Sequence, residues 1–208
     1  YKVDGAQFTE KIFASHVDDA LIISLETTAE KGLDFDIRLS RPKDQDIPTV
    51  QVTTDNNNEL IMDGMVTQRG GIVENKPYPM EDGVKFQTRL KATSQGGTIS
   101  ASDRHLELRG VKSAVIYLVT KTSFYHQDYK TKAQENLSAV TSKSFEQLLQ
   151  RHSEDFGEFY DRVHFSLGDA ALDSLPTDKR LQRYKDGQVD LDLQTKLFDY
   201  GRYLLISS

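Results

Sequence analysis

The acidic residues whose spacing comes closest to a catalytic pair are Asp34 and Asp36, two positions apart. General acid–base catalysis needs two titratable groups that face one pocket. Both residues instead alternate with apolar residues across 33–39, which is the period-two pattern of a half-buried antiparallel strand. We therefore interpret the pair as a solvated feature on the outer surface of a sheet.

A second polar cluster, formed by Asp55, Asn57 and Glu59, imitates the beginning of a calcium-binding loop. Such a loop needs glycine at its sixth position for a sharp turn, and this sequence has Leu60 there. A polar turn is the better interpretation. Because the chain contains no cysteine, disulfides and thiolate metal sites are excluded as well.

Histidine and tyrosine residues are further candidates. The five histidines do not cluster in the sequence, and His152 falls on the apolar side of a predicted helix, where we expect a packed core histidine. Tyr78, Tyr125 and Tyr129 fall in predicted loops and could stack on a sugar face, although the absence of Trp weakens that hypothesis. Asn136 begins an Asn-Leu-Ser tripeptide that matches a glycosylation acceptor, a pattern common by chance.

Motifs for catalysis or cofactor binding are missing from the sequence. It contains no Gly-rich phosphate loop, no nucleophile elbow and no zinc signature. We accordingly assign no catalytic residue, no cofactor-binding residue, no cofactor and no metal ligand to this chain. Spacing alone supports a non-catalytic β-sandwich joined to a helical domain.

Composition narrows the class of protein further. The 208 residues are 37% hydrophobic and 28% charged, which is typical of a soluble globular protein with a sizeable core. The net charge of −6 argues against nucleic acid or an anionic membrane as a partner, since both favour clustered Lys and Arg. No stretch approaches the roughly 20 apolar residues of a membrane span.

The first 127 residues are dominated by strand patterns. Alternating runs bounded by turn residues predict strands at 8–15, 20–28, 33–40, 50–54, 84–92, 98–102, 106–108 and 114–120. Asp63-Gly64 lies between two short apolar runs and predicts a tight hairpin turn. Residues 70–82 contain Gly-Gly and two prolines and predict a long loop. Ten or so short strands of this kind predict an antiparallel β-sandwich.

From residue 128 the pattern becomes helical. One helix is predicted at 128–142, and a longer one begins after Ser144, whose capping-box partner is Gln147. Its apolar face should cover the β-sandwich and contains Phe145, Leu148, Leu149 and Phe156. Gly157 is a potential end or bend of this helix.

The remaining segments are shorter. Alternation across 163–168 predicts a return strand, Thr177 is expected to cap a helix that ends at Asp186-Gly187, and Asp190 should cap the last helix. That last helix carries almost no polar side near its end, where Leu197, Phe198, Leu204 and Leu205 occur. A helix that is apolar all round belongs in the core of a larger domain. We therefore expect the chain to stop inside a helical domain, with these side chains packed on the sandwich, the linker or a neighbouring molecule.

Several stretches resemble glycoside hydrolase family 95. They are Asp4-Gly5, KIFAS at residues 11–15, the run 152–168, LPTDKRL at 175–181, and GRYLLISS at 201–208. Their order and spacing resemble the family along nearly the whole chain, and GRYLLISS after LPTDKRL is the most specific part. In the family, an Arg-Glu pair is often found just before the Phe that corresponds to Phe13, and residues 8–13 of this sequence lack that pair.

The resemblance implies an N-terminal β-sandwich joined by linker helices to an (α/α)6 barrel. It also implies α-L-fucosidase activity, mostly on α-1,2 linkages, with some family members acting on α-L-galactosides. The general-acid Glu, the Asp base and the supporting Asn residues of the family lie downstream of Ser208, so no catalytic residue is carried onto this chain. Tyr1 falls inside the family's β-domain, which implies that early strands precede it.

We thus expect a mainly β fold with C-terminal helices, an antiparallel super-sandwich followed by linker helices and the start of an α/α barrel. The expected parts are the sandwich at 1–127, linker helices and return strand at 128–175, and the first barrel helices at 176–208. The expected parent is a secreted or periplasmic inverting hydrolase of fucosylated oligosaccharides, and the missing barrel is the partner in cis. The alternatives are a sugar-binding or docking sandwich without catalysis and a family 65-like phosphorylase.

Overall fold

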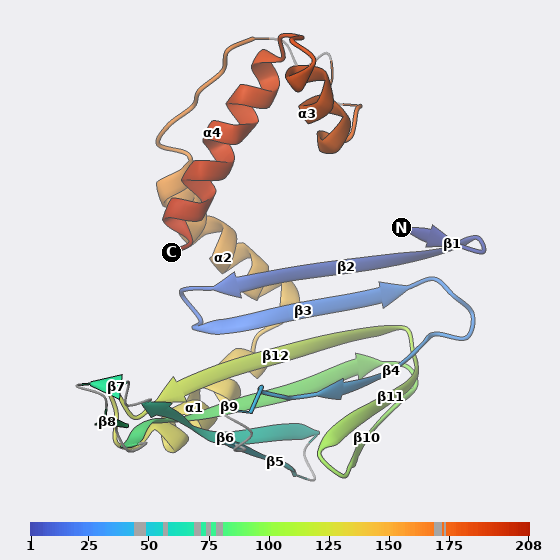
Figure 1. The fold of residues 1–208 in the computed structure, drawn as a ribbon. Helices are drawn as coiled ribbons and strands as arrows, with labels where there is room; N and C mark the ends of the chain where they lie inside the picture. The colour runs from blue at the N-terminus through green and yellow to red at the C-terminus, as the bar shows by residue number, and fades with distance from the viewer. Residues whose placement is uncertain are drawn as a thin grey trace. The chain divides into compact units, whose positions relative to one another are not determined.

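The computed structural model describes residues 1–43, 49–55, 58–68, 72–73, 76–77, 81–168, 172 and 174–208. These residues form two compact units, Tyr1–His152 and Ser153–Ser208. The first unit is mainly antiparallel β-structure, and helices follow it along the chain (Figure 1). The predicted fold class, mainly β with C-terminal helices, is therefore confirmed, whereas the three-part division of the chain remains a prediction.

Twelve strands occur in the described part of the first unit. They are β1 (Lys2–Val3), β2 (Ala6–Ser15), β3 (Ala20–Thr27), β4 (Leu33–Arg38), β5 (Val50–Thr54), β6 (Glu59–Gln68), β7 (Ile72–Val73), β8 (Lys76–Pro77), β9 (Glu81–Gln95), β10 (Thr98–Ser102), β11 (His105–Val111) and β12 (Ser113–Thr122). The large sheet has the order β1-β2-β3-β12-β9-β6-β5, and β10-β11-β4 form a smaller one. β7 and β8 pair with each other.

Strand β12 is central to the large sheet, between β3 and β9. Its residues alternate between two hydrophobic clusters, with Tyr117 and Val119 on one face and Ala114 and Ile116 on the other. A strand buried on both faces is expected to be apolar throughout. The central position of β12 is therefore the one that its apolar sequence at 114–120 indicates.

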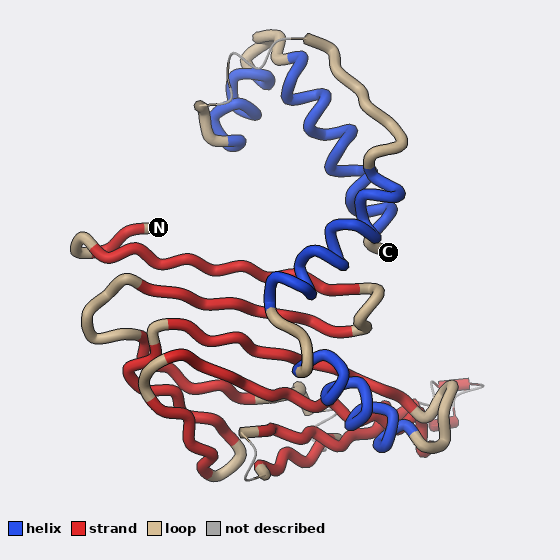
Figure 2. Tube along the Cα trace, turned by 180° about the vertical axis from the view of Figure 1, so that it is seen from behind, coloured by secondary structure: helices blue, strands red, loops and turns tan. Residues whose placement is uncertain are grey.

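The core has two layers, one on each face of the large sheet. On one face, Leu60, Leu90 and Ile116 pack with Leu106 and Leu108 of the small sheet. Residues of helix α1 (Tyr129–Thr141) and of the first part of helix α2 (Phe145–Tyr160) pack on the other face. That face of the large sheet is turned toward the viewer in Figure 2. Antiparallel sheets packed in this way interdigitate their inner side chains into a sandwich core.

One predicted turn is wrong. Asp63-Gly64 lies inside the continuous strand β6, where Gly64 pairs with both Val50 and Phe86. A Cβ at Gly64 would come within 2.4 Å of the Phe86 ring and 2.8 Å of Val50 Cγ1. The glycine is thus needed for close packing of a ring across the strand, and it makes no turn.

Helices α1 (Tyr129–Thr141) and α2 (Phe145–Tyr160) follow the last strand. The predicted capping box is present, because Ser144 N donates to Gln147 Oε1 at 2.9 Å and Gln147 N donates to Ser144 Oγ at 3.2 Å. Phe145 and Leu148 are buried against the sheet, as predicted. The helix continues past Gly157.

Helix α2 belongs to both units, because the division falls after His152. Leu149 is half-buried on the sandwich core, but Phe156 stacks on Tyr160 and lies near Tyr203 in the second unit. The prediction that this helix covers the sandwich is therefore confirmed for Phe145 and Leu148, which belong to the first unit.

The second unit contains α3 (Thr177–Lys185) and α4 (Leu191–Ile206). The predicted return strand is absent, since 163–167 adopt no strand conformation and find no pairing partner among the described residues. Helix α3 begins after Pro176, so Thr177 is its first residue and not its cap. Asp190 caps α4 as predicted, accepting from Leu193 N at 2.9 Å.

Helix α4 buries none of its residues. Phe198 contacts Phe165 of the linker, as expected. Leu197 and Leu205 are 70% and 78% exposed, so the packing expected for them, which includes a neighbouring molecule, stays a prediction. No helix in the described residues is long and apolar enough to cross a membrane.

The burial of α2 on the sandwich is testable. Replacing fully buried Leu148 by Ala should lower the free energy of unfolding by about 2–5 kcal/mol, because it removes methyl groups and leaves a cavity. Half-buried Leu149→Ala is the matched control and should cost clearly less. Chemical denaturation monitored by circular dichroism measures both, and equal losses would contradict this packing.

Candidate functional site

The candidate acid–base pair lies on the outer face of the small sheet. Asp36 Oδ1 accepts from Arg109 Nη2 at 2.7 Å, and this guanidinium holds the pKa of Asp36 below its ordinary value. Asp34 Oδ1 accepts from Gly110 N at 2.6 Å. Both carboxylates are exposed and bound within the sheet surface, which agrees with the prediction of a solvated pair on the outer surface of a sheet.

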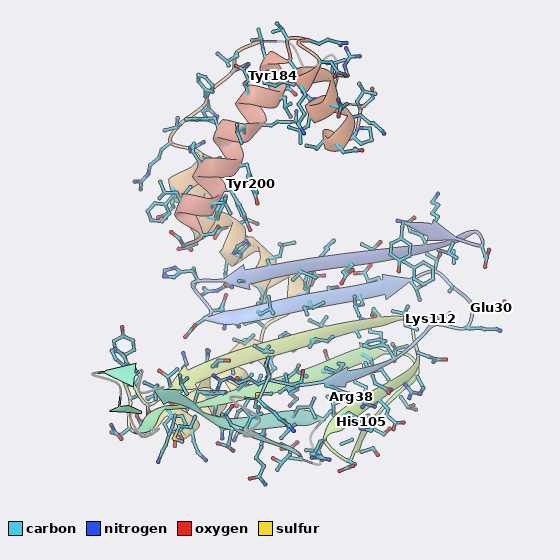
Figure 3. The ribbon with its side chains drawn as sticks, viewed as in Figure 1. Glu30, Arg38, His105, Lys112, Tyr184 and Tyr200 are labelled. Carbon is cyan, nitrogen blue, oxygen red and sulfur yellow. The ribbon has the colours of Figure 1, made fainter. Side chains whose placement is uncertain are left out.

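Neighbouring side chains extend this polar surface. Glu107 lies between His105, whose Nε2 is 3.0 Å from Glu107 Oε1, and Arg109, which is 3.5 Å away. Arg38 and His105 mark this face in Figure 3. Because each charged group already faces an opposite charge, the arrangement resembles a surface ion-pair network of modest energetic value.

Asp55 and Glu59, from the sequence that imitates a calcium loop, lie where β5 ends and β6 begins. Asp55 Oδ1 accepts from Glu59 N at 3.2 Å, and Glu59 Oε2 is 3.0 Å from Arg89 Nη1. Asn57 lies outside the described residues. Among the residues that are described, no group of three or more His, Asp or Glu side chains is placed to hold a metal ion.

The remaining candidates are dispersed. Tyr125 is 81% exposed and meets Phe124 edge-on, Tyr129 begins α1, and Tyr78 lies outside the described part of the chain. His152 is half-buried, with its ring stacked 4.9 Å from that of Phe13, consistent with a packing role. The described candidates therefore lie at different places, with Tyr125 and Tyr129 just before and at the beginning of α1 and His152 in α2.

Sequence reasoning missed a buried carboxylate that anchors the linker helices. Asp18, in the β2–β3 turn, is 6% exposed and accepts from Ser15 Oγ at 3.0 Å. Arg151 Nε of α2 donates to both of its oxygens at 3.2 Å, and Lys143 Nζ lies 3.3 Å away. Burial alone would raise the pKa of Asp18, but these donors outweigh it and hold the pKa below its ordinary value.

The next residue of the same turn anchors α1. Asp19 O accepts from Asn136 Nδ2 at 2.9 Å, and the Asp19 carboxylate pairs with Lys121 of β12. The side chain of the possible glycosylation residue is thus used in a structural hydrogen bond. Asp18 and Asp19 together fasten both linker helices to one sheet turn.

A second buried ion cluster joins α3 to α4. Arg180 is 3% exposed, and its Nε and Nη2 donate to the two oxygens of Asp190 at 2.9 and 2.6 Å. Its Nη2 also donates to Asp192 Oδ2 at 2.8 Å, and Lys196 Nζ reaches the same oxygen at 2.6 Å. The Arg180 guanidinium lowers the pKa of Asp190 to about 2. Paired geometry of this kind is what allows charges to remain buried.

A third guanidinium closes the end of α2. Arg202 Nη1 donates to Val163 O at 2.8 Å, and Nη2 donates to Tyr160 O, the last carbonyl of α2. Its guanidinium lies 4.6 Å from the centre of the Tyr160 ring. The last carbonyls of a helix lack partners inside the helix, so Arg202 supplies one from α4.

These anchors include two arginines from the sequence motifs singled out above. Arg180 belongs to LPTDKRL and Arg202 to GRYLLISS. In the sequence, the only indication of these buried contacts is that each Arg occurs within a motif whose other residues favour apolar packing or a turn. Within the described residues, the contacts shown by these groups are structural.

The fold and these contacts define an antiparallel β-sandwich module followed by helices that buried ion pairs hold in place. Residues 1–127 match the family model described as "Glycosyl hydrolase family 65, N-terminal domain", so the chain belongs to that family. Residues 144–208 match the model described as "Glycosyl hydrolase family 95 catalytic domain". The resemblance to family 95 is thereby confirmed. The β-sandwich residues match the model of the family 65 N-terminal domain instead.

Two known proteins illustrate these relationships. "Alpha-L-fucosidase 2" of Arabidopsis thaliana is 25% identical and aligns with 100% of this chain, which spans 27% of that protein's length. A solved structure titled "Putative kojibiose phosphorylase from human microbiome" has a TM-score of 0.46 and 11% identity, covering 76% of this chain and 22% of the other. The chain is thus related to glycoside hydrolases and corresponds to about a quarter of its curated relative.

The Asp18 anchor should make stability depend on pH. Because the folded-state pKa lies below the ordinary 3.8, its contribution is present above about pH 4 and is lost as the pH falls toward the folded-state pKa. Asp18→Asn should cost about 1–3 kcal/mol at neutral pH and reduce the loss of stability in acid. Denaturation at several pH values measures this, with exposed Asp103→Asn as control, and parallel pH profiles for Asp18→Asn and the wild type would contradict it.

The Arg180 cluster predicts a selective effect on the second unit. Arg180→Met leaves Asp190 without its buried partner, so α3 and α4 should open more often while the sandwich is unaffected. Hydrogen exchange should be faster in residues 177–206 and unchanged in β12. Neighbouring Lys179→Met, a change at a 71% exposed side chain, should have no such effect, and equal exchange in the two variants would argue against the cluster.

Proposed function

We propose that this chain is the non-catalytic N-terminal portion of an inverting glycoside hydrolase, an α-L-fucosidase that cleaves α-1,2-fucosyl linkages of glycans. The observation that supports this most is the order of the matches along one chain. A match to a glycosyl hydrolase N-terminal domain over residues 1–127 is followed by a match to the family 95 catalytic domain over residues 144–208. The alignment of the whole chain with an α-L-fucosidase supports the fucoside specificity.

The role proposed for these residues is to carry and orient the beginning of the catalytic domain. Inverting hydrolysis needs an acid and a base roughly 6.5–9.5 Å apart across a pocket that holds the sugar and a water molecule. In the described residues, the sandwich carboxylates Asp34 and Asp36 are exposed and hydrogen-bonded to Gly110 and Arg109 of the same sheet. The catalytic groups are therefore proposed to lie in polypeptide that continues the helical domain.

The second unit has an apolar surface suited to such a continuation. Helix α4 exposes Leu197, Tyr200, Leu204 and Leu205, and Tyr184 of α3 is also exposed; Tyr184 and Tyr200 are labelled in Figure 3. Exposed apolar side chains that lie together are often covered by a further part of a protein. We propose that further helices of a barrel cover it in cis. The parent enzyme is proposed to be secreted or periplasmic and to act on fucosylated oligosaccharides.

Two other functions have specific observations in their favour. The family 65 description of the sandwich favours a disaccharide phosphorylase, whose turnover would require inorganic phosphate. Exposed Tyr125 and Phe124 favour a sugar-binding sandwich without catalysis, because aromatic rings present faces for sugars. In that second case the 208-residue chain alone would bind fucosylated glycans.

One experiment separates these functions. The chain and a longer gene product that contains it are incubated with an α-1,2-fucosyl oligosaccharide, with and without phosphate, and followed by proton NMR. We expect no turnover by the 208-residue chain, and release of β-L-fucose before mutarotation by the longer protein, independently of phosphate, because inversion converts an α-linkage into a β-product.

The possible results are distinct. Turnover by the chain alone would refute the structural role. Initial release of α-L-fucose would refute inversion, and phosphate-dependent formation of a sugar phosphate would favour the phosphorylase. Line broadening of the glycan by the chain, without turnover, would favour the binding module.

A further inference from the structure

Helix α1 lies over strands β9 and β12, and its two ends rest on surfaces of different character (Figure 1). The buried residues of the helix all lie beyond its first turn: Ala133, Leu137 and Val140. The last two of them pack into the apolar cluster on this face of the sheet, with Tyr117 and Val119. The first turn instead meets the sheet through a charged contact, in which Lys130 Nζ lies 2.7 Å from Asp63 Oδ1 of β6.

A series of polar side chains in the sheet leads to this contact. Glu59 and Gln87 are buried, and Arg89 joins them, because its Nη1 lies 3.0 Å from Glu59 Oε2 and its Nε donates to Gln87 Oε1 at 2.8 Å. Gln87 Nε2 then donates to Asp63 Oδ1 at 3.1 Å. The four side chains and Lys130 therefore form one continuous series from the sheet to the helix.

The amide of Gln87 can take only one orientation in this series. Arg89 offers no hydrogen-bond acceptor, and the Asp63 carboxylate offers no donor. Turning the amide over would bring two donors together at Arg89 and two acceptors together at Asp63. Gln87 therefore holds Asp63 Oδ1 in a fixed direction, and Lys130 Nζ binds this same oxygen.

The first turn of α1 depends on this carboxylate because the helix begins without negative charge of its own. Among the described residues, no side chain caps α1 at Asp128, and its first turn contains no acidic residue. Lys130 and Lys132 lie there instead, and positive charge near a helix N-terminus opposes the helix dipole. Helix α2, by contrast, begins with a capping box and Glu146. Asp63 supplies the missing negative charge from the sheet, and its hydrogen bond raises the pKa of Lys130 above the ordinary value.

We propose that the first turn of α1 is an electrostatic latch, which opens and closes while the rest of the helix stays packed. The ion pair between Lys130 and Asp63 is the contact that closes it, and Gln87 is a positioning residue. The segment released by opening is 124–132. It begins after Ser123, whose N donates to Lys85 O at 2.8 Å and whose Oγ accepts from Lys85 N at 3.0 Å. The inference is independent of the catalytic activity proposed above.

The latch lets the connection between sheet and helices adjust at one place. The released segment carries exposed Phe124 and Tyr125, so opening changes where their rings lie. The later part of α1 stays fastened by its apolar residues and by Asn136, which donates to Asp19 O at 2.9 Å. The closing ion pair is exposed, and salt screens such pairs, so higher ionic strength should favour the open form.

The test is hydrogen exchange of the 208-residue chain, followed by NMR at about 0.01 M and about 1 M sodium chloride. The amides of residues 132–134 bond to carbonyl groups at the beginning of α1, whereas those of 138–141 bond to carbonyl groups further along. Salt should speed exchange of the first set, relative to the second set in the same sample, by roughly twofold to fivefold.

Asp63→Asn is the principal variant, because its amide oxygen can still accept from Gln87 but carries no charge opposite Lys130. It should speed exchange of 132–134 at low salt and remove the salt effect. Adding Lys130→Met should slow these amides again, because it takes an unpaired positive charge away from the helix N-terminus. Lys132→Met is the matched control, since Lys132 pairs with Glu135 inside the helix, and it should keep the salt effect.

Gln87→Met tests the positioning role, because methionine has a similar length but neither donates to Asp63 nor accepts from Arg89. It should reduce the salt effect on residues 132–134. A general loss of sandwich stability would speed exchange of residues 138–141 as well, so the ratio between the two sets isolates the latch.

Other results would overturn the proposal. Equal acceleration by salt over all of α1 would show that the helix opens as one unit. A salt effect in Asp63→Asn as large as in the wild type would show that Asp63 does not close the turn. Loss of the salt effect in Lys132→Met would show general helix electrostatics instead of one contact. An unchanged salt effect in Gln87→Met would refute the positioning role of Gln87.

Discussion

The position of the linker helices depends on one buried carboxylate. Asp18 lies in a tight turn at the end of the sheet, and its oxygens receive donors from Ser15 within the turn, from Lys143 before α2 and from Arg151 within α2. A carboxylate removed from water is costly unless donors surround it, so the turn, the interhelical segment and α2 are constrained together. The capping box at Ser144 then fixes where α2 starts, and Phe145 and Leu148 can enter the sheet core only from that start. Packing and charge therefore specify one arrangement.

The strands were largely predictable from sequence because their pattern is local. Alternation located β4 and the middle of β9, although not all of their ends, and the apolar run at 114–120 located the central strand β12. Two local patterns failed for non-local reasons. Gly64 resembles a turn residue, yet it sits in mid-strand because the Phe86 ring needs its space. Residues 163–167 alternate like a strand, but a strand exists only where another strand pairs with it, and none in the described residues does.

The candidate site was predictable only in part. The surface character of Asp34 and Asp36 followed from period-two alternation, because that pattern fixes which side of a strand faces water. The anchors were not predictable in the same way, since Asp18 and Arg151 are 133 positions apart and Asp190 meets Arg180 across a helix connection. No periodicity joins such residues. Their only trace in the sequence was the presence of Arg180 and Arg202 in motifs otherwise suited to packing or turning.

The contacts inside the first unit differ in kind from the contacts inside the second unit. The first has two extensive apolar clusters, one on each face of its large sheet. In the second, α4 buries none of its residues, and an isolated helix of this length is marginal in water. What fixes α4 is charge: Asp190 caps its start and binds Arg180, while Arg202 reaches back to the end of α2. Ion pairs constrain direction more than they stabilise, whereas apolar burial supplies most of the folding free energy. In the second unit the described ion pairs therefore fix the direction of α4, whereas apolar burial contributes less there than in the sandwich.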